Sequence, residues 1–175
     1  MKRAWVGALL LGAVVAAPPA TADPLPDLSG YTEANPDDFG NYYNYPATYG
    51  INFSVAAGYR CRITYTWKAN PNVKDAWCWG DLPGTASNAV SVRLGMDSDP
   101  ARFYNGDLAG IEEYHPPPPN VNPPQQVDPA SYKLLPAGSK VAYSGSATCA
   151  AADAMTVCVL GEHGFVLKPD GSQAF

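Results

Sequence analysis

The four cysteines, Cys61, Cys78, Cys149 and Cys158, are the residues of this 175-residue chain with the most definite chemistry. An even number of cysteines predicts two disulfides when a chain folds in an oxidising compartment. Of the three possible pairings we favour Cys61–Cys78 and Cys149–Cys158, because each joins neighbours in sequence across a turn-like segment. In the chain-entropy model, closing loops of this size stabilises a fold by roughly 2.5–3 kcal/mol each.

A metal site built from cysteines and histidines is the alternative use of these residues. The C-x2-C and H-x3-H spacings of zinc sites are absent, and His115 and His163 are the only histidines. Asp97 and Asp99 have the spacing that opens a calcium loop, but the glycine and the distant glutamate of an EF-hand do not follow. We predict no metal and no cofactor.

Enzymatic chemistry has little support in the sequence. No serine stands in a G-x-S-x-G motif, and His163, close to two glycines, is typical of a turn residue. Cysteines in disulfides supply no thiolate. A glycosidase needs only two carboxylates beside a cleft, so a hydrolase acting on cell-wall glycan stays open as the alternative. The acidic residues that could supply such a pair are Asp81, Asp97, Asp99, Asp107, Glu112 and Glu113.

Aromatic side chains are the strongest indication of a functional surface. Flat amphipathic rings give binding surfaces large contact area at low entropic cost. The competing interpretation places Tyr65, Trp67 and one of Trp77 or Trp79 in the core against the first disulfide. The candidate binding aromatics are Tyr42, Tyr43, Tyr45, Tyr49, Trp77 and Trp79.

The N-terminal residues predict export. Lys2 and Arg3 precede an apolar run over residues 4–17, and the small residues Ala20-Thr21-Ala22 follow. This order is that of a signal peptide, and the run is shorter than the ~20 residues that span a bilayer. We predict cleavage after Ala22, no transmembrane segment in the mature chain, and a secreted, extracellular or cell-wall location.

The net charge of the chain is −5, and loss of Lys2 and Arg3 with the signal peptide makes the mature part more acidic. An acidic surface repels phosphate backbones, and no basic run interrupts it. The composition therefore excludes nucleic acid as a partner. Abundant Tyr, Trp, Gly and Pro favour strands and turns over helices.

Alternating apolar and polar residues predict a mainly β protein. Residues 60–68 give the clearest strand, with Cys61 and Ile63 on one face and Arg60 and Arg62 on the other. Further strands are predicted at residues 51–55, 77–79, 90–94, 140–143, 155–159 and 164–167. This pattern fits a small antiparallel sandwich or open barrel with two disulfides.

We predict a signal peptide at residues 1–22, an irregular N-terminal arm at residues 23–50 and one β domain at residues 51–175. A proline-rich segment at residues 115–130 interrupts the domain and is expected to form a polyproline II strap or mobile linker.

Two separated patterns resemble a known group. They are the Gly58-Tyr59-Arg60-Cys61 segment with Cys78-Trp79-Gly80-Asp81, and later Leu135-Pro136-Ala137-Gly138 with Thr148-Cys149, Val157-Cys158 and His163-Gly164-Phe165. Together they resemble small exported proteins of mycobacteria and related actinomycetes, over most of residues 53–175 except the proline-rich strap. The resemblance implies export and paired cysteines, and it implies no activity.

We therefore expect a secreted or cell-wall-associated, non-catalytic protein that binds an envelope protein or a glycan. A glycan hydrolase with a carboxylate pair is the alternative, and a purely structural or inhibitory module is the third class. Two carboxylates converging in a cleft would favour the hydrolase, and exposed aromatic rings on one surface would favour binding.

Overall fold

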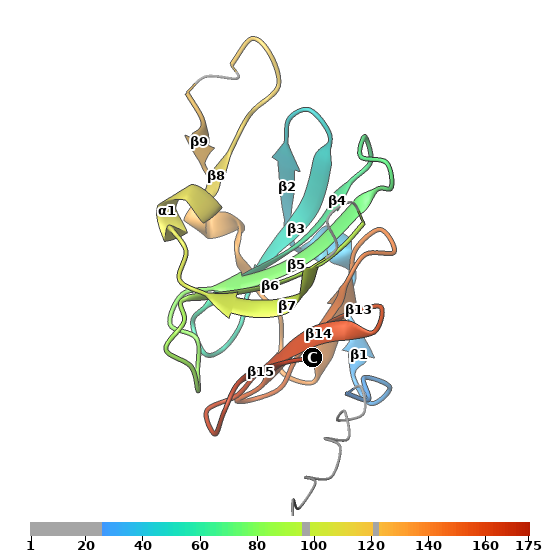
Figure 1. Ribbon diagram of the computed structural model, residues 1–175, viewed down its shortest axis with the longest axis vertical. Coiled ribbons are helices and arrows are strands. Elements are labelled where there is room, and N and C mark those ends of the chain that lie inside the picture. Colours follow the sequence, from blue (N-terminus) through green and yellow to red (C-terminus); the bar gives the residue numbers. More distant parts are fainter. Residues whose placement is uncertain (1–25, 96–98, 121–122) are drawn as a thin grey trace, which may run out of the picture.

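The computed structural model describes residues 26–95, 99–120 and 123–175; the predicted signal peptide lies outside them. Two β-sheets pack face to face, as Figure 1 shows, and they form an open sandwich of the predicted mainly β class. A short helix and a two-stranded ribbon lie beside the larger sheet, away from the smaller one (Figure 1). This exposed side of the larger sheet is called the outer face below.

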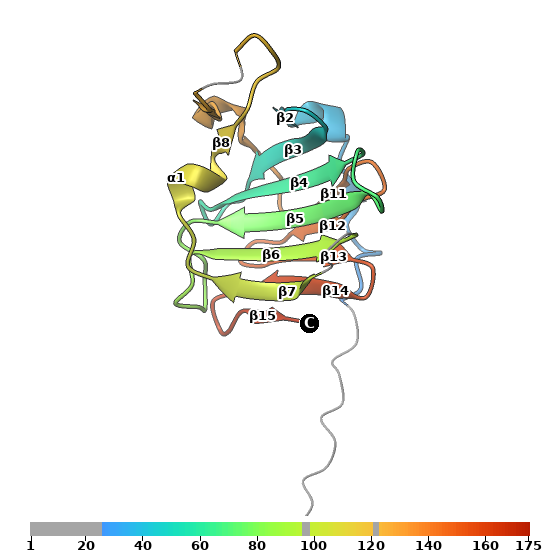
Figure 2. The same ribbon diagram turned by 45° about the horizontal axis from the view of Figure 1, so that its top comes forward.

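The larger sheet has seven strands, and five of them form an antiparallel meander from β3 to β7 (Figure 2). Strand β2 pairs antiparallel with most of β3, and β10 pairs parallel with its end. The strands are Gly40–Asn44 (β2), Thr48–Ser54 (β3), Arg60–Thr66 (β4), Val73–Trp79 (β5), Ala89–Leu94 (β6), Asp99–Tyr104 (β7) and Lys133–Leu134 (β10).

The smaller sheet has six strands in the order β1-β11-β12-β13-β14-β15, of which only the β1–β11 pair is parallel. Strands β11, β13 and β14 follow the predicted ones closely, and β12 and β15 were not predicted. The strands are Thr32–Glu33 (β1), Ser139–Ala142 (β11), Thr148–Ala151 (β12), Thr156–Leu160 (β13), His163–Leu167 (β14) and Gln173–Ala174 (β15).

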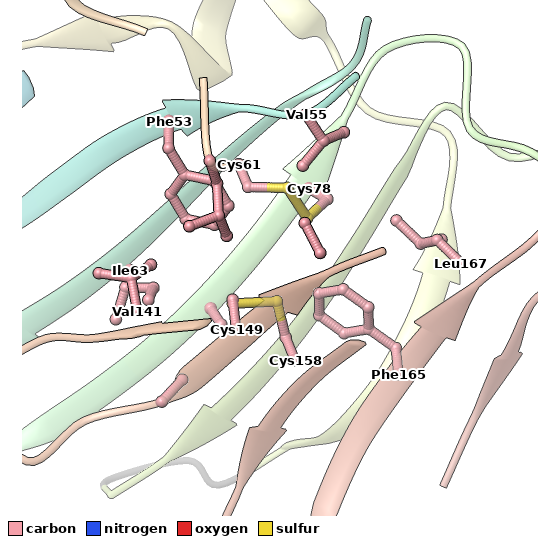
Figure 3. Packing of buried hydrophobic residues seen from close by; sticks show 14 of the residues in the cluster. Phe53, Val55, Cys61, Ile63, Cys78, Val141, Cys149, Cys158, Phe165 and Leu167 are labelled. Atoms are coloured by element: carbon pink, nitrogen blue, oxygen red, sulfur yellow. A yellow bond between two sulfur atoms is a disulfide. The ribbon is translucent and has the colours of Figure 1, made fainter. Parts of the chain in front are cut away.

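Both disulfides have the predicted pairing and lie in the core between the sheets (Figure 3). Cys61 is directly opposite Cys78 on β4 and β5, and Cys149 is directly opposite Cys158 on β12 and β13. Each pair has a Cα–Cα distance of 4.1 Å, close to that of a non-hydrogen-bonded antiparallel pair. Each disulfide therefore joins neighbouring strands of one sheet.

The main apolar core draws on both sheets. Phe53 and Ile63 of the larger sheet belong to the same buried cluster as Val141 and Phe165 of the smaller sheet (Figure 3). These residues come from both sides of the proline-rich segment, so neither half of the chain buries its apolar face alone.

The segment that connects β7 to β10 crosses the outer face of the larger sheet. It contains α1 (Leu108–Ile111), the ribbon of β8 (Glu113–Tyr114) and β9 (Gln125–Gln126), and the 3-10 turn η2 (Pro129–Ser131). A second apolar cluster holds it there, formed by Tyr42, Trp79, Ala89, Val127 and Tyr132. The proline-rich segment 115–130 thus contributes β9 and η2, where a polyproline II strap or linker was expected.

The described part of the predicted N-terminal arm, residues 26–50, is more regular than expected. It contains β1, the 3-10 turn η1 (Pro36–Asp38), β2 and the start of β3. Strand β1 depends on pairing with β11, more than 100 residues away in the chain, so no local pattern marks it.

The placement of tryptophans in the core against the disulfide was wrong. Trp67 is 49% exposed, and the strand alternation turns Trp77 and Trp79 away from Cys78 toward the outer face. Trp79 is buried in the second cluster instead, beneath the connecting segment.

Candidate binding groove on the outer face

A groove of about 780 Å³ lies on the outer face of the larger sheet, between the meander and the connecting segment. Three rows of side chains, each running across neighbouring strands, supply most of the lining that comes from the sheet, and Tyr104 of β7 adds to them. The rows follow from the registers of β2 to β7. They are Arg62, Trp77, Ser91 and Arg102; then Tyr42, Thr64, Asp75, Arg93 and Asp99; then Asn44, Thr48, Thr66 and Val73.

Alternation along β4 explains why polar residues reach this face. Cys61 and Ile63 point into the core, so Arg62 and Thr64 must point outward. The disulfide partners Cys61 and Cys78 are opposite each other, and this register sets Arg62 opposite Trp77 and Thr64 opposite Asp75.

Arg62 is the most buried arginine of the groove, with 6% of its surface exposed. Its Nε donates to Asn52 Oδ1 at 2.7 Å, Nη1 donates to the carbonyl of Ile111 at 2.9 Å, and Nη2 donates to the Tyr132 hydroxyl at 3.2 Å. Its guanidinium carbon lies 3.8 Å from the centre of the Tyr42 ring. Neutral acceptors and an aromatic face therefore surround this cation.

Asp75 is the buried carboxylate of the groove, and burial raises its pKa above the usual 3.8. Arg93 lowers the pKa of Asp75, because its Nε donates to Asp75 Oδ1 at 2.6 Å. The Thr64 hydroxyl donates to Oδ2 at 3.3 Å, and a hydrogen bond from Trp77 also lowers the pKa. Both oxygens of Asp75 are thus used within the sheet.

The rim of the groove carries further charges with partners of their own. Arg102 lies 3.3 Å from Asp99 in an exposed ion pair. Asp107 accepts from the backbone of Ala109 at the start of α1, and Glu113 accepts from Gln126 across the ribbon.

Glu112 fixes the connecting segment to the sheet. Its Oε1 accepts from the Arg60 guanidinium and from the indole Nε1 of Trp79, the latter at 2.9 Å. The next residue back, Ile111, accepts from Arg62. Two adjacent residues at the end of α1 therefore fasten this wall of the groove.

A smaller cavity of about 270 Å³ adjoins the groove, and Tyr42 lines both. Tyr43, Tyr114 and Asn52 also line the smaller cavity. Asn52 is fully buried, and its Nδ2 has no hydrogen-bond partner among the described residues.

The six predicted binding aromatics do not form one surface. Tyr42 and Trp77 line the groove, and Tyr43 lines the smaller cavity. Trp79 is buried, while Tyr45 and Tyr49 are exposed and line neither cavity. Tyr49 instead packs on Tyr43, with ring centres 4.8 Å apart.

Among the acidic residues considered for a hydrolase, Asp99, Asp107 and Glu113 line the groove. Asp81 does not, Glu112 is used as a fastening, and Asp97 lies outside the described residues. Sequence reasoning missed Asp75, Arg62 and Asn52 as site residues. The sequence did contain a signal for Arg62 and Asp75. Pairing Cys61 with Cys78 fixes the register of β4 and β5, and this register sets which outward-facing residues are neighbours.

Within residues 26–95, 99–120 and 123–175, no group of three or more His, Cys, Asp or Glu side chains is placed to hold a metal ion. In the same part of the chain, none of the helices has the length and apolarity needed to cross a bilayer. No family model matches the chain, and comparisons with curated proteins and with solved structures find no match.

Proposed function

We propose that this is an exported, non-catalytic protein whose outer-face groove binds a glycan of the cell envelope or extracellular space. The groove itself is the observation that supports the proposal. Its volume of about 780 Å³ falls within the usual range for small-molecule sites, roughly 300–1,000 Å³. Export rests on the signal-peptide pattern of residues 1–22 and on two disulfides, which are typical of oxidising compartments.

The mixture of groups in the groove suits a sugar chain. Trp77 and Tyr104, both half-buried, supply ring faces on which the C–H face of a sugar can stack. Thr48, Thr66 and Asn44 supply hydroxyl and amide groups for its hydroxyls. Most residues that line the groove are polar, and a concave polar site of this kind suits a sugar chain.

Trp77 is the residue to change first, because it is half-buried in the centre of the row that crosses the groove. Truncating an aromatic anchor typically costs on the order of 2 kcal/mol of binding, so Trp77→Ala should weaken binding more than about tenfold. The assay is an array of neutral and acidic oligosaccharides probed with purified protein. Trp67→Ala is the matched control, since Trp67 is 49% exposed and does not line the groove.

Binding that is equally strong in Trp77→Ala and Trp67→Ala would place the site elsewhere and contradict the proposal. Melting temperatures of both variants should be recorded, so that loss of binding is not confused with loss of fold.

A glycan hydrolase is the second candidate, and the raised pKa of Asp75 in the groove favours it. Asp75 is, however, only 5% exposed, and its two oxygens are directed at Arg93 and Thr64 of the sheet. Binding is therefore the better supported function. Release of reducing ends from an array-positive glycan, abolished in Asp75→Asn, would establish the hydrolase instead.

A further inference from the structure

Arg62 is a buried cation without an acid of its own among the described residues. Its three hydrogen bonds go to an amide oxygen, a backbone carbonyl and a phenol. Burial raises the pKa of Tyr42 and of Tyr132, so both phenols that face the guanidinium stay neutral. An arginine keeps its charge in a protein, and a buried charge is costly unless it is paired.

The other arginines on this face differ from Arg62 in this respect. Arg93 pairs with Asp75, Arg102 pairs with Asp99, and Arg60 pairs with Glu112. The arginine that is buried most deeply, and that gains most from a counterion, is therefore the one that the described residues leave without a carboxylate. Two of the five N–H groups of Arg62 remain beyond its three hydrogen bonds.

The side chain of Asn52, which accepts a hydrogen bond from Arg62, is itself incompletely hydrogen-bonded within the described part of the chain. Its Oδ1 accepts from Arg62, while its fully buried Nδ2 donates to no group of the described residues. An aspartate of the same shape would keep the bond to Arg62, neutralise its charge and remove the unpartnered donor. A buried donor without a partner is destabilising, so stability of the fold alone would favour aspartate here.

We propose that Arg62 receives an anionic group, carboxylate or phosphate, from the ligand in the groove, and that asparagine at position 52 keeps this cation available. The inference rests on the proposed function and narrows its ligand to an acidic glycan. Arg62 lines the groove directly opposite Trp77, so an acidic substituent on a sugar stacked on Trp77 would lie next to this side chain. Charge-assisted hydrogen bonds of this kind are about twice as strong as neutral ones.

The test compares three small probes that share a glucose ring: glucuronate, glucose 6-phosphate and glucose. Calorimetry measures affinity, and the NMR signal of the Arg62 Nε–H group reports contact with the guanidinium. At least one of the two acidic probes should bind about tenfold or more tightly than glucose and shift this signal. The two acidic probes separate carboxylate from phosphate as the group that the site prefers.

Asn52→Asp is the decisive variant, because it supplies Arg62 with a carboxylate inside the protein. The preference for the acidic probe over glucose should fall to within about twofold, while the melting temperature stays the same or rises. Asn120→Asp is the control, since it adds the same charge at an exposed position outside the groove.

Equal affinity of the wild-type protein for glucuronate, glucose 6-phosphate and glucose would overturn this inference, whether or not the variant folds. A preference for acidic probes that persists in Asn52→Asp would overturn it as well. Glycan binding that depends on Trp77 but shows no preference for acidic ligands would leave the proposed function standing and remove only the role of Arg62.

Discussion

Replacing Glu112 tests whether the connecting segment is fastened to the sheet through one carboxylate. Glu112→Ala removes the acceptor of the Trp79 indole N–H, which lies in a side chain that is only 2% exposed. Leaving such a donor unpartnered costs about 1–3 kcal/mol. Losing the ion pair with Arg60, whose side chain is 34% exposed, adds at most about 1 kcal/mol. Glu112→Ala should therefore lower the free energy of unfolding by about 1–4 kcal/mol.

Glu112→Gln separates the two contributions. Its amide oxygen still accepts from Trp79, so only the charge opposite Arg60 is lost and the cost should stay below about 1 kcal/mol. Urea denaturation followed by tryptophan fluorescence gives both values, and amide exchange of α1 and β8 shows whether the segment loosens locally. Glu162→Ala, at an exposed turn, is the control and should change stability by less than about 0.5 kcal/mol. Equal costs for Glu112→Ala and Glu112→Gln would refute the reasoning.

Two further predictions concern the core and the groove. Replacing the Cys61–Cys78 pair by alanines should cost slightly more than replacing Cys149–Cys158, about 3 against about 2.5 kcal/mol in the chain-entropy model, because the sequence separations are 17 and 9. Denaturant titration of both double variants measures this, and a clearly larger cost for Cys149–Cys158 would contradict it. For Asp75, burial raises the folded-state pKa above the unfolded value near 3.8, so the folded state binds the proton more tightly. The stability of the wild-type protein relative to Asp75→Asn should therefore fall as pH rises from about 3.8 through the raised pKa; a relative stability that rises over this range would show that Arg93 outweighs burial.

Strand alternation and cysteine spacing were enough to predict much of the fold. Residues 60–68 alternate so regularly that both faces of β4 could be assigned, and the structure confirms that Cys61 and Ile63 face the core. The prediction that each disulfide joins two cysteines close in sequence is also confirmed. Both inferences depend on short-range order along the chain, which is why they succeeded.

The candidate site was predicted less well. Tyr42 and Trp77 line the groove as proposed, but Tyr45, Tyr49 and Trp79 do not. The arm tyrosines cluster in sequence, yet neighbours on a strand point to opposite faces. Closeness in sequence therefore could not group them on one surface.

The amino-acid sequence alone determined the mainly β class, the disulfide partners and the outward direction of Arg62, because each depends on residues near one another in the chain. Only the tertiary structure decided that residues 108–114 and 125–132 lie on the outer face and bring Ile111 and Tyr132 to this arginine. Those contacts span about 50 and 70 residues, so no local pattern in the chain marks them. Burial of Arg62, and with it the chemistry proposed for the groove, is thus a property of the assembled fold.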